Sequence, residues 1–398
     1  MAATSLNSCH LTMWLSMQRR IELDAARGAM LVWMTLTHLP TVVSTYVNQP
    51  FGFVSGAEGF IFLSALFTGR IYLLVAEREG YKVMGSQLWM RTLRLYIYHL
   101  ILLAFAFVVV ARLASGTHRP ALHNLLDFYF AAPRQAPIFA ALLIYRPPLL
   151  DILPMYITFL VLTPLALIVA RRIGWEFILI GGFTLWLAAQ FGLRQVAYDF
   201  GTRVTGINIP LSATGSFDLF AWQFMWLVGL YCGVRWAKDD LAASDWARRV
   251  LVPALVIVPV LLALRYAVGR GVELGMFEIF FDKWHEGAVR IINFAAVAAL
   301  LIRFQAFLKP VAIRPLVMMG QASLQVFCAH LLFCFIGLAV MGYAPVLNGW
   351  HETALVTITL SGMLLTAQAF SRNRVKTPTE HALGDRAAVS RPLPQFGD

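Results

Sequence analysis

The sequence predicts an all-α, polytopic integral membrane protein with about ten transmembrane helices and both termini in the cytoplasm. Of its 398 residues, 59% are hydrophobic and 13% are charged, and the mean hydropathy is +0.69. A soluble domain would carry about twice that charged fraction. About ten apolar runs reach the length that a helix needs to cross a bilayer. These runs start near Gly28, Ser55, Leu88, Leu149, Glu176, Phe217, Val250, Glu286, Pro315 and Thr353.

The basic residues indicate the orientation of these helices, because Lys and Arg concentrate in the cytoplasmic loops of membrane proteins. If the amino terminus is cytoplasmic, about 22 of the 32 Lys and Arg residues fall on the inside. Both termini are therefore predicted to be cytoplasmic. The same distribution explains the net charge of +11, so we expect the lipid bilayer and no nucleic acid as a partner.

The first apolar run contains Arg27 and, eleven residues later, His38. Ionisable side chains are costly inside a bilayer, so an intramembrane histidine is a functional candidate by default. On one helix, His38 would lie within roughly 20° of the face of Arg27 and about 16 Å deeper in the membrane. The spacing predicts a base near the bilayer centre below a cation at the cytoplasmic surface. A packing histidine and a positive-inside anchor are the alternatives.

Charged residues also occur at the predicted outer ends of two other runs. Glu58 lies near the outer end of the second run, where it would orient His38, bind an acceptor, or serve only as a helix-start carboxylate. Lys283 and Arg290 lie at the start of the eighth run, where they would bind an anion or carbohydrate or act as solvated interface charges. For His330, in the ninth run, no spacing indicates a link to the first run, and we expect a packing role.

Residues 1–371 are predicted to form a single transmembrane domain. Residues 372–398 are polar and proline-containing, which predicts a disordered cytoplasmic tail. Two outer connections, residues 115–148 and 192–216, are longer than simple turns and are candidates for a binding mouth. Residues 1–18 lack the pattern of a cleaved signal peptide, so we expect the first run itself to direct insertion.

The four cysteines give no indication of a metal site or a disulfide framework. Cys232, Cys328 and Cys334 lie within apolar runs, without CxxC or mixed His/Cys ligand spacing. The phosphate-loop, nucleophile-elbow and HExxH motifs are also missing from the sequence. We therefore expect no metal and no bound cofactor.

Several segments carry a resemblance that spans about residues 20–345. These are Arg20–Gly28 (RIELDAARG), Thr37–Pro40 (THLP), Phe51–Phe53 (FGF), Ala57–Ser64 (AEGFIFLS), Asp151–Ile157 (DILPMYI), Trp222–Gln223 (WQ) and Met319–Phe327 (MGQASLQVF). Together they resemble the OpgC family of bacterial inner-membrane proteins, which is similar to the acyltransferase-3 superfamily. In that superfamily an arginine, a ten-residue gap and a histidine mark the active site, and the match falls on Arg27 and His38.

The sequence departs from the superfamily pattern at two positions. Ala65 stands where glycine is common, and Thr37 stands where many relatives carry an acidic or other polar residue. Any carboxylate partner of His38 must therefore come from elsewhere in the chain.

The resemblance implies a multi-pass inner-membrane O-acyltransferase. Such an enzyme moves a succinyl or similar acyl group from cytoplasmic acyl-CoA, the co-substrate, to hydroxyls of osmoregulated periplasmic glucans. A transporter or flippase for a glycan or acyl group is the main alternative, although no inverted repeat is evident. A non-catalytic subunit of a glycan-assembly complex is a third, which would leave the pairing of Arg27 with His38 unexplained.

In the acyltransferase interpretation each candidate residue has a role. His38 is the catalytic base, which takes a proton from the acceptor hydroxyl, and Glu58 assists it. An arginine fork suits the phosphates of coenzyme A, and a cation suits the carboxylate of a succinyl group. We expect the donor to bind Arg27, Arg91 and Arg94, and the acyl carboxylate or acceptor to bind Lys283 and Arg290.

Overall fold

The computed structural model describes residues 21–117, 120–238, 243–341 and 349–375. Every regular element in these ranges is a helix, which confirms the all-α prediction. The long helices are α2 (Ile21–His38), α4 (Gly56–Glu79), α5 (Tyr81–Phe105), α10 (Ile152–Ile173), α11 (Trp175–Gln190), α13 (Leu219–Ala237), α15 (Leu251–Val268), α17 (Ala288–Arg303), α20 (Ser323–Met341) and α21 (Gly349–Val375). The shorter ones are α3 (Val42–Val47), α6 (Ala111–Thr117), α7 (Pro120–Leu125), α8 (Asp127–Ala131), α9 (Ala136–Ala141), α12 (Leu193–Thr205), α14 (Ala243–Arg249), α16 (Glu278–Phe281), α18 (Gln305–Leu308) and α19 (Arg314–Gln321).

Among the described residues, seven helices are long and apolar enough to cross a membrane, or eight if α11 and α12 form one bent span. All ten predicted apolar runs are helical, but some do not meet this criterion. The run near Gly28 forms α2, whose first turns carry Glu22, Asp24 and Arg27, and the run near Glu286 forms α17, which has only 16 residues. The chain is a multi-pass membrane protein, and the expected number of ten counts helices that are shorter or more polar than a typical span.

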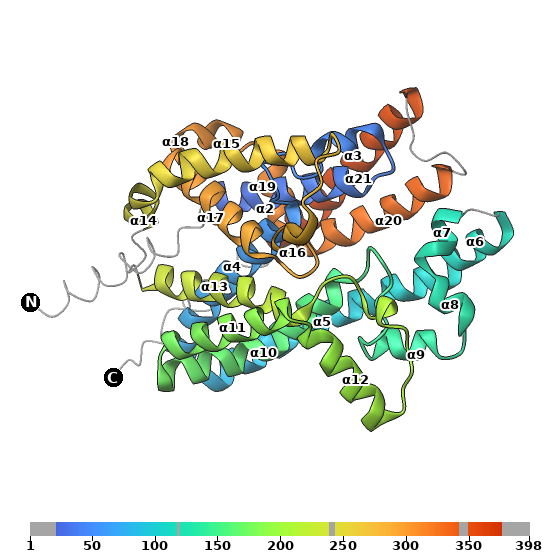
Figure 1. Cartoon of the computed structure of the whole chain (residues 1–398), viewed down its shortest axis with the longest axis horizontal. Coiled ribbons are helices and arrows are strands. Elements are labelled where there is room, and N and C mark those ends of the chain that lie inside the picture. Colours follow the sequence, from blue (N-terminus) through green and yellow to red (C-terminus); the bar gives the residue numbers. More distant parts are fainter. Residues whose placement is uncertain (1–20, 118–119, 239–242, 342–348, 376–398) are drawn as a thin grey trace, which may run out of the picture.

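The helices form one bundle in which α4 lies between two groups (Figure 1). On one side, α13, α11, α10 and α5 pack in succession, and α4 contacts both α13 and α5. On the other side, α2 contacts α4, α19 and α20, and α20 in turn packs on α21. The candidate site therefore forms where α2, α4, α5 and α20 meet.

The beginning of α4 is fixed by a capping box. The Ser55 hydroxyl accepts a hydrogen bond from the Ala57 backbone N–H at 3.4 Å. The Glu58 carboxylate accepts from the Ser55 backbone N–H at 3.0 Å, so that two backbone donors at the helix start are satisfied. The helix ends at Gly80, whose φ of 90° favours glycine. This cap fixes the position of Glu58 at the predicted outer end of α4.

Small residues let α2 approach α19 closely. At Gly28 and Gly320 an added Cβ would overlap the backbone carbonyl of the facing helix, at Leu316 and Asp24 respectively. Glycine at such contacts permits the close backbone packing that is common between membrane helices. The contact brings Arg27 of α2 next to the start of α20, which follows α19 directly.

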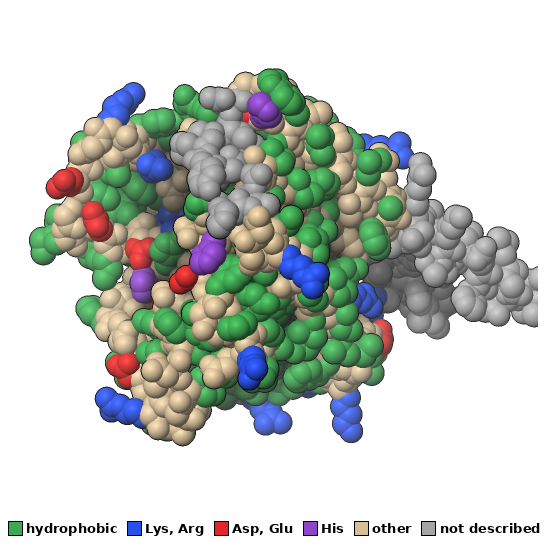
Figure 2. Space-filling view, turned by 90° about the vertical axis from the view of Figure 1, so that its right-hand side faces the viewer, with side chains coloured by type: hydrophobic (Ala, Val, Ile, Leu, Met, Phe, Trp, Pro, Cys, Tyr) green, Lys and Arg blue, Asp and Glu red, His purple; other side chains and the backbone are tan. Residues whose placement is uncertain are grey.

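Much of the outer surface of the bundle is apolar. Only 11% of the most apolar stretch of α15 and 22% of that of α21 is buried within the chain. Large side chains such as Val252, Val256 and Leu365 are exposed there. Figure 2 shows apolar side chains over much of the face in view. Exposed apolar helix faces of this extent suit contact with lipid chains.

The two long outer connections contain further helices. The first, residues 115–148, includes α7, α8 and α9. The second, residues 192–216, begins with α12, which bends by 84° from α11. At the other end of the chain, α21 continues to Val375, beyond the predicted start of the tail at residue 372. Residues 376–398 of that predicted tail lie outside the described residues.

Candidate active site

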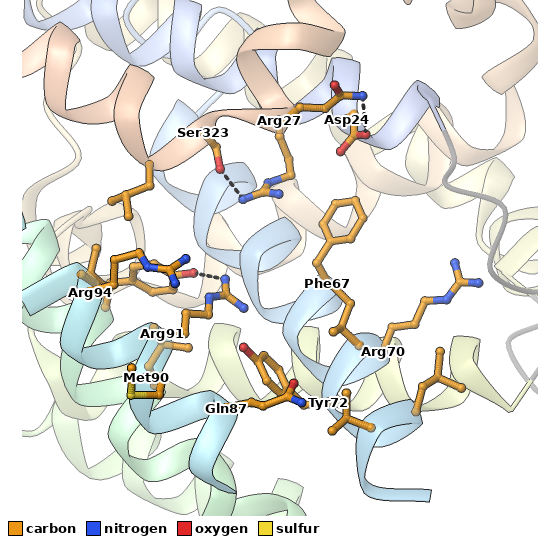
Figure 3. A pocket seen from close by; sticks show the side chains of 18 of the residues that line it. Asp24, Arg27, Phe67, Arg70, Tyr72, Gln87, Met90, Arg91, Arg94 and Ser323 are labelled. Carbon is orange, nitrogen blue, oxygen red and sulfur yellow. Dashed lines mark hydrogen bonds between the residues drawn. The ribbon is translucent and has the colours of Figure 1, made fainter. Parts of the chain in front are cut away.

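A deep cavity of about 770 Å³ opens between α2, α4, α5, α10 and α20. Arginine side chains gather on its lining, and they come from three different helices (Figure 3). These are Arg27 of α2, Arg70 and Arg78 of α4, and Arg91 and Arg94 of α5. The structure thus brings together the three arginines that the sequence indicated as donor ligands, with two more beside them.

Arg27 is held at the junction of α2 and α20. Its Nη2 donates a hydrogen bond to the Ser323 hydroxyl at 2.6 Å. Its guanidinium also lies over the ring of Phe67, 5.1 Å from the ring centroid, in a cation–π arrangement. Figure 3 shows the side chain pointing from α2 into the cavity.

Arg91 is held on the facing wall of the cavity by two hydroxyl groups. Its Nη1 donates to the Thr68 hydroxyl at 3.1 Å, and its Nη2 donates to the Tyr156 hydroxyl at 2.7 Å. Arg94 follows one turn later on α5 and also lines the cavity. Neutral hydroxyls fix the position of the Arg91 guanidinium without cancelling its charge, so the wall stays attractive to anions.

The cavity is long in the direction of α4. Arg78 and Phe60 both line it and both belong to α4. At 1.5 Å per residue, their separation along the helix is about 27 Å, compared with about 30 Å for a hydrocarbon core. The arginine end is the predicted cytoplasmic end, and the aromatic end lies near the predicted outer surface.

Two aromatic rings lie at the end of the cavity that is closest to the histidine pair. Phe60 of α4 and Phe327 of α20 both line it, and their rings stack with centroids 5.8 Å apart. The ring of Phe327 also meets the ring of His330 edge-on at a centroid distance of 4.8 Å. Phe327 therefore has the cavity on one side and a histidine on the other.

His38 lies at the last residue of α2, where it stacks on His330 of α20. The ring centroids are 5.8 Å apart and the planes differ by 19°. His330 Nδ1 lies 2.6 Å from the Phe327 carbonyl oxygen, which can only accept, so the proton is assigned to Nδ1 and the lone pair to Nε2. Neither His330 Nε2 nor His38 Nδ1 has a hydrogen-bond partner among the described residues. The pair thus holds two buried nitrogen atoms whose hydrogen-bonding capacity is not used by the described residues.

Thr37, the residue before the histidine, does not assist it. Its hydroxyl donates to the carbonyl oxygens of Trp33, at 2.7 Å, and Met34, at 3.0 Å, within the same helix. This back-bonding is common for threonine in helices. The charge that acts on His38 from outside its own helix pair is that of Lys283.

Glu58 belongs to a buried ionic cluster instead of contacting His38. Its Oε1 accepts a short hydrogen bond from Arg290 Nη2, and its Oε2 accepts from the Ser55 backbone and hydroxyl. The side chains of Glu58, Arg290 and Glu286 are all inaccessible to solvent, and Glu286 Oε2 lies 4.0 Å from Arg290 Nε. Both oxygens of Glu58 are therefore occupied. Of the roles considered for it, helix capping is the one that its hydrogen bonds support, and it has no direct contact with His38 among the described residues.

Glu286 is the strained member of this cluster. Its φ is 46°, a left-handed conformation that is costly for a residue other than glycine. Burial, together with the neighbouring charge of Glu58, raises the pKa of Glu286 well above its ordinary value. Strained, buried ionisable residues of this kind are frequent at functional sites.

Lys283 joins the ionic cluster to the histidine pair. Burial lowers its pKa, while Glu58, Asp151 and Glu286 act in the opposite direction. The charge of Lys283 also acts on His38, and its ammonium lies over the ring of Trp284, 5.0 Å from the ring centroid. It is only partly buried, in contrast to Arg290. Of the two predicted ligands for an acyl carboxylate, Lys283 is the one not enclosed by the fold.

A family model described as OpgC protein matches residues 19–376. The chain belongs to the OpgC family. The resemblance seen in the sequence is thereby confirmed, and membership supports a role as a transferase. No curated protein and no solved structure matches the chain.

The predicted residues of this OpgC family member fall into two groups in the structure. Arg27, Arg91 and Arg94 line one cavity. Glu58 and Arg290 meet in the ionic cluster, with Lys283 next to it. His38 is connected to the cavity through His330 and Phe327.

Sequence analysis predicted a packing role for His330 and did not predict its contact with His38. Its pairing with His38 joins two helices that are far apart in the chain, so no local spacing could show it. The only signal was that His330 is a second histidine within an apolar run, the same observation that singled out His38. Arg70 and Arg78 were missed as site residues because topology alone accounts for cytoplasmic arginines.

Proposed function

We propose that this protein is an O-acyltransferase that takes a short acyl group from acyl-CoA on the cytoplasmic side and passes it to a hydroxyl of a periplasmic glucan. The inner membrane of a bacterium is the location that such a reaction requires. The observation that supports the proposal most strongly is the arginine-lined cavity, which ends two ring contacts away from His38.

The cavity suits coenzyme A in both charge and shape. Five arginines along the cavity match the several phosphate charges of this molecule, and Arg91 keeps its fork oriented through Thr68 and Tyr156. The end of the cavity that is lined by Phe60 and Phe327 would receive the pantetheine arm. A donor bound in this way has its thioester next to Phe60 and Phe327, at the inner end of the cavity.

His38 would then act as the general base. It takes the proton of the acceptor hydroxyl while that oxygen forms a bond to the thioester carbonyl carbon. The carbon–sulfur bond breaks, and the imidazolium returns the proton to the departing thiolate, so that an ester and free coenzyme A result. His330 stacks on His38 and holds its ring in place for both transfers.

A succinyl donor fits the charges around His38. Its free carboxylate needs a cation near the reacting carbonyl, and Lys283 is the partly buried cation that acts on His38. Arg290 already satisfies Glu58 and is enclosed. Lys283 is therefore our candidate for selecting a succinyl group over a neutral one of similar size.

The glucan would approach from the opposite side to coenzyme A. A second cavity, of about 560 Å³, is lined there by Gln190, Glu278, Asp282 and His285 together with the ring of Phe281. Carboxylate, amide and imidazole groups beside an aromatic ring suit the hydroxyls and apolar faces of sugars. This cavity supports a carbohydrate acceptor without specifying a cyclic or a linear glucan.

The test is mass spectrometry of periplasmic glucans from cells that lack the protein and are complemented with defined variants. Wild type should restore acyl-substituted glucans, and the added mass identifies the acyl group. His38→Ala should fail to restore them at equal membrane abundance. His99→Ala is the control, because His99 is a buried histidine of α5, a different helix from those that carry His38 and His330.

Two outcomes contradict the proposal. Restoration by His38→Ala would remove the catalytic role of that residue. If wild type restores glucan substitution only when a separate acyltransferase is present, the protein is a transporter of the acyl group or glycan. Purified protein with labelled succinyl-CoA separates these cases, because only an acyltransferase releases free coenzyme A.

A further inference from the structure

The boundary between the arginine-lined cavity and the histidine pair consists of two phenylalanine rings. Phe60 comes from α4 and Phe327 from α20, so the boundary joins two separate helices. Their side chains are 7% and 3% exposed, and both contribute to the cavity lining. A group that moves from the cavity toward His330 and His38 along these contacts meets the ring of Phe327.

The distances show how short that passage is. The centroid of Phe327 lies 4.8 Å from that of His330, and the centroid of His330 lies 5.8 Å from that of His38. Two ring contacts thus separate the inner end of the cavity from the proposed base. Phe60 and Phe327 are the residues of the cavity lining that lie on this series of ring contacts, since Phe327 touches both Phe60 and His330.

A pair of rings at this place acts on the acyl group more than on coenzyme A. The nucleotide and its phosphates remain near the arginines, whereas the carbonyl carbon has to come within reach of His38. Each additional methylene of the acyl chain must then be accommodated against the two rings. Closely packed aromatic side chains yield little to such an insertion.

We propose that Phe60 and Phe327 determine the size of the acyl group that reaches His38, and that they restrict it to short chains of about the length of succinyl. This inference rests on the proposed acyltransferase function. Phe327 is the main determinant, because its ring touches both Phe60 and His330. Neither ring takes part in bond formation, and both are specificity-determining residues.

The experiment compares acyl-CoA donors of different length with the purified full-length protein and a glucan acceptor. The donors are acetyl-, succinyl- and hexanoyl-CoA, and kcat/KM is obtained from the release of free coenzyme A together with the mass of the glucan product. Phe327→Leu and Phe60→Leu should each raise the hexanoyl-to-succinyl ratio of kcat/KM by about tenfold or more. Phe327→Trp should lower the same ratio.

Phe335→Leu is the matched control. Phe335 lies two turns further along α20, is 3% exposed, and packs on Phe105 outside the cavity lining. Its replacement removes the same atoms from an equally buried position and should leave the ratio unchanged. Because the readout is a ratio within one protein preparation, a partial loss of folded protein does not alter it.

The possible failures are distinguishable. If wild type transfers succinyl groups but Phe327→Leu, Phe60→Leu and Phe327→Trp all keep the wild-type ratio, the size filter is wrong and the acyltransferase function stands. If Phe335→Leu changes the ratio as much as Phe327→Leu does, a local filter is excluded. If wild type consumes none of the three donors, the acyltransferase function and the filter are both overturned.

Discussion

The arginine-lined cavity and the ionic cluster use the same residue type in opposite ways. In the cavity, Arg91 is held by the hydroxyls of Thr68 and Tyr156. In the cluster, Arg290 is inaccessible to solvent and is paired with the carboxylate of Glu58. Neutral partners orient a guanidinium and leave its charge to attract a ligand, whereas a carboxylate partner cancels that charge.

This difference indicates which arginine binds and which one supports the fold. A buried ion pair recovers little net stability, because the desolvation of both ions opposes their attraction. Its members nevertheless depend on each other, since the loss of one leaves the other charged and buried. An arginine whose hydrogen-bond partners are neutral hydroxyl groups leaves no buried charge behind when it is replaced. The two regions should therefore respond to the same substitution in different ways.

Replacement of Arg290 should produce the largest effect on stability. Arg290→Met leaves the carboxylates of Glu58 and Glu286 without their buried cation, which should cost about 3–5 kcal/mol. The measurement is the temperature at which the detergent-solubilised protein loses its monodisperse peak. The double variant Glu58→Leu with Arg290→Met should recover part of the loss. A single variant that melts within about 2 °C of wild type would show that the pair does not support the fold.

Replacement of Arg91 should affect substrate binding more than stability. Arg91→Ala removes a charge-assisted contact to coenzyme A that we expect to be worth about 1.5–3 kcal/mol, which corresponds to a rise in KM for the donor of roughly 10- to 150-fold. The apparent melting temperature should change little. The control is Arg171→Ala, because Arg171 stacks on Tyr81 at the end of α10 and lies outside the cavity lining. An Arg91→Ala protein with an unchanged KM would place the donor elsewhere.

Sequence reasoning predicted the helices and the arginine-lined side of the site, because both depend on patterns within short stretches of the chain. Apolar length predicts each helix, and the eleven-residue spacing places Arg27 and His38 on one helix. The bias of basic residues toward the cytoplasm brought Arg91 and Arg94 into consideration. The cavity in which these arginines meet confirms that they share one region, while their ligand stays a prediction.

The contacts that complete the site could not be predicted, because they join distant parts of the chain. Glu58 and Arg290 are 232 residues apart, and Arg27 and Ser323 are 296 apart. No periodicity within one helix reports which faces of two remote helices will meet. The stacking of His330 on His38 has the same origin, so a residue interpreted as packing lies beside the proposed base.

The pair formed by His285 and Asp282 is a third arrangement, a charge pair near the surface. We expect its replacement to have the smallest effect on stability. His285 Nδ1 lies 2.5 Å from Asp282 Oδ2, and both side chains are about one-third exposed. The hydrogen bond to Asp282 raises the pKa of His285 above its ordinary 6.5. Burial alone would raise the pKa of Asp282, but the hydrogen bonds from His285 and from the Trp284 backbone, together with the charges of His285 and Arg290, outweigh it and lower that pKa.

The sign of each shift determines the pH range in which this pair stabilises the protein. A histidine whose pKa is raised on folding contributes fully below pH 6.5, and the contribution is lost as the pH rises through the raised pKa. The lowered pKa of Asp282 removes its contribution at acidic pH. The melting temperature of wild type should therefore exceed that of His285→Gln by most in the mildly acidic range, with the gap closing toward alkaline pH. A difference in melting temperature that is independent of pH would mean that His285 stabilises the protein through packing and not through its charge. Solvent would then screen the attraction between this partly exposed histidine and Asp282.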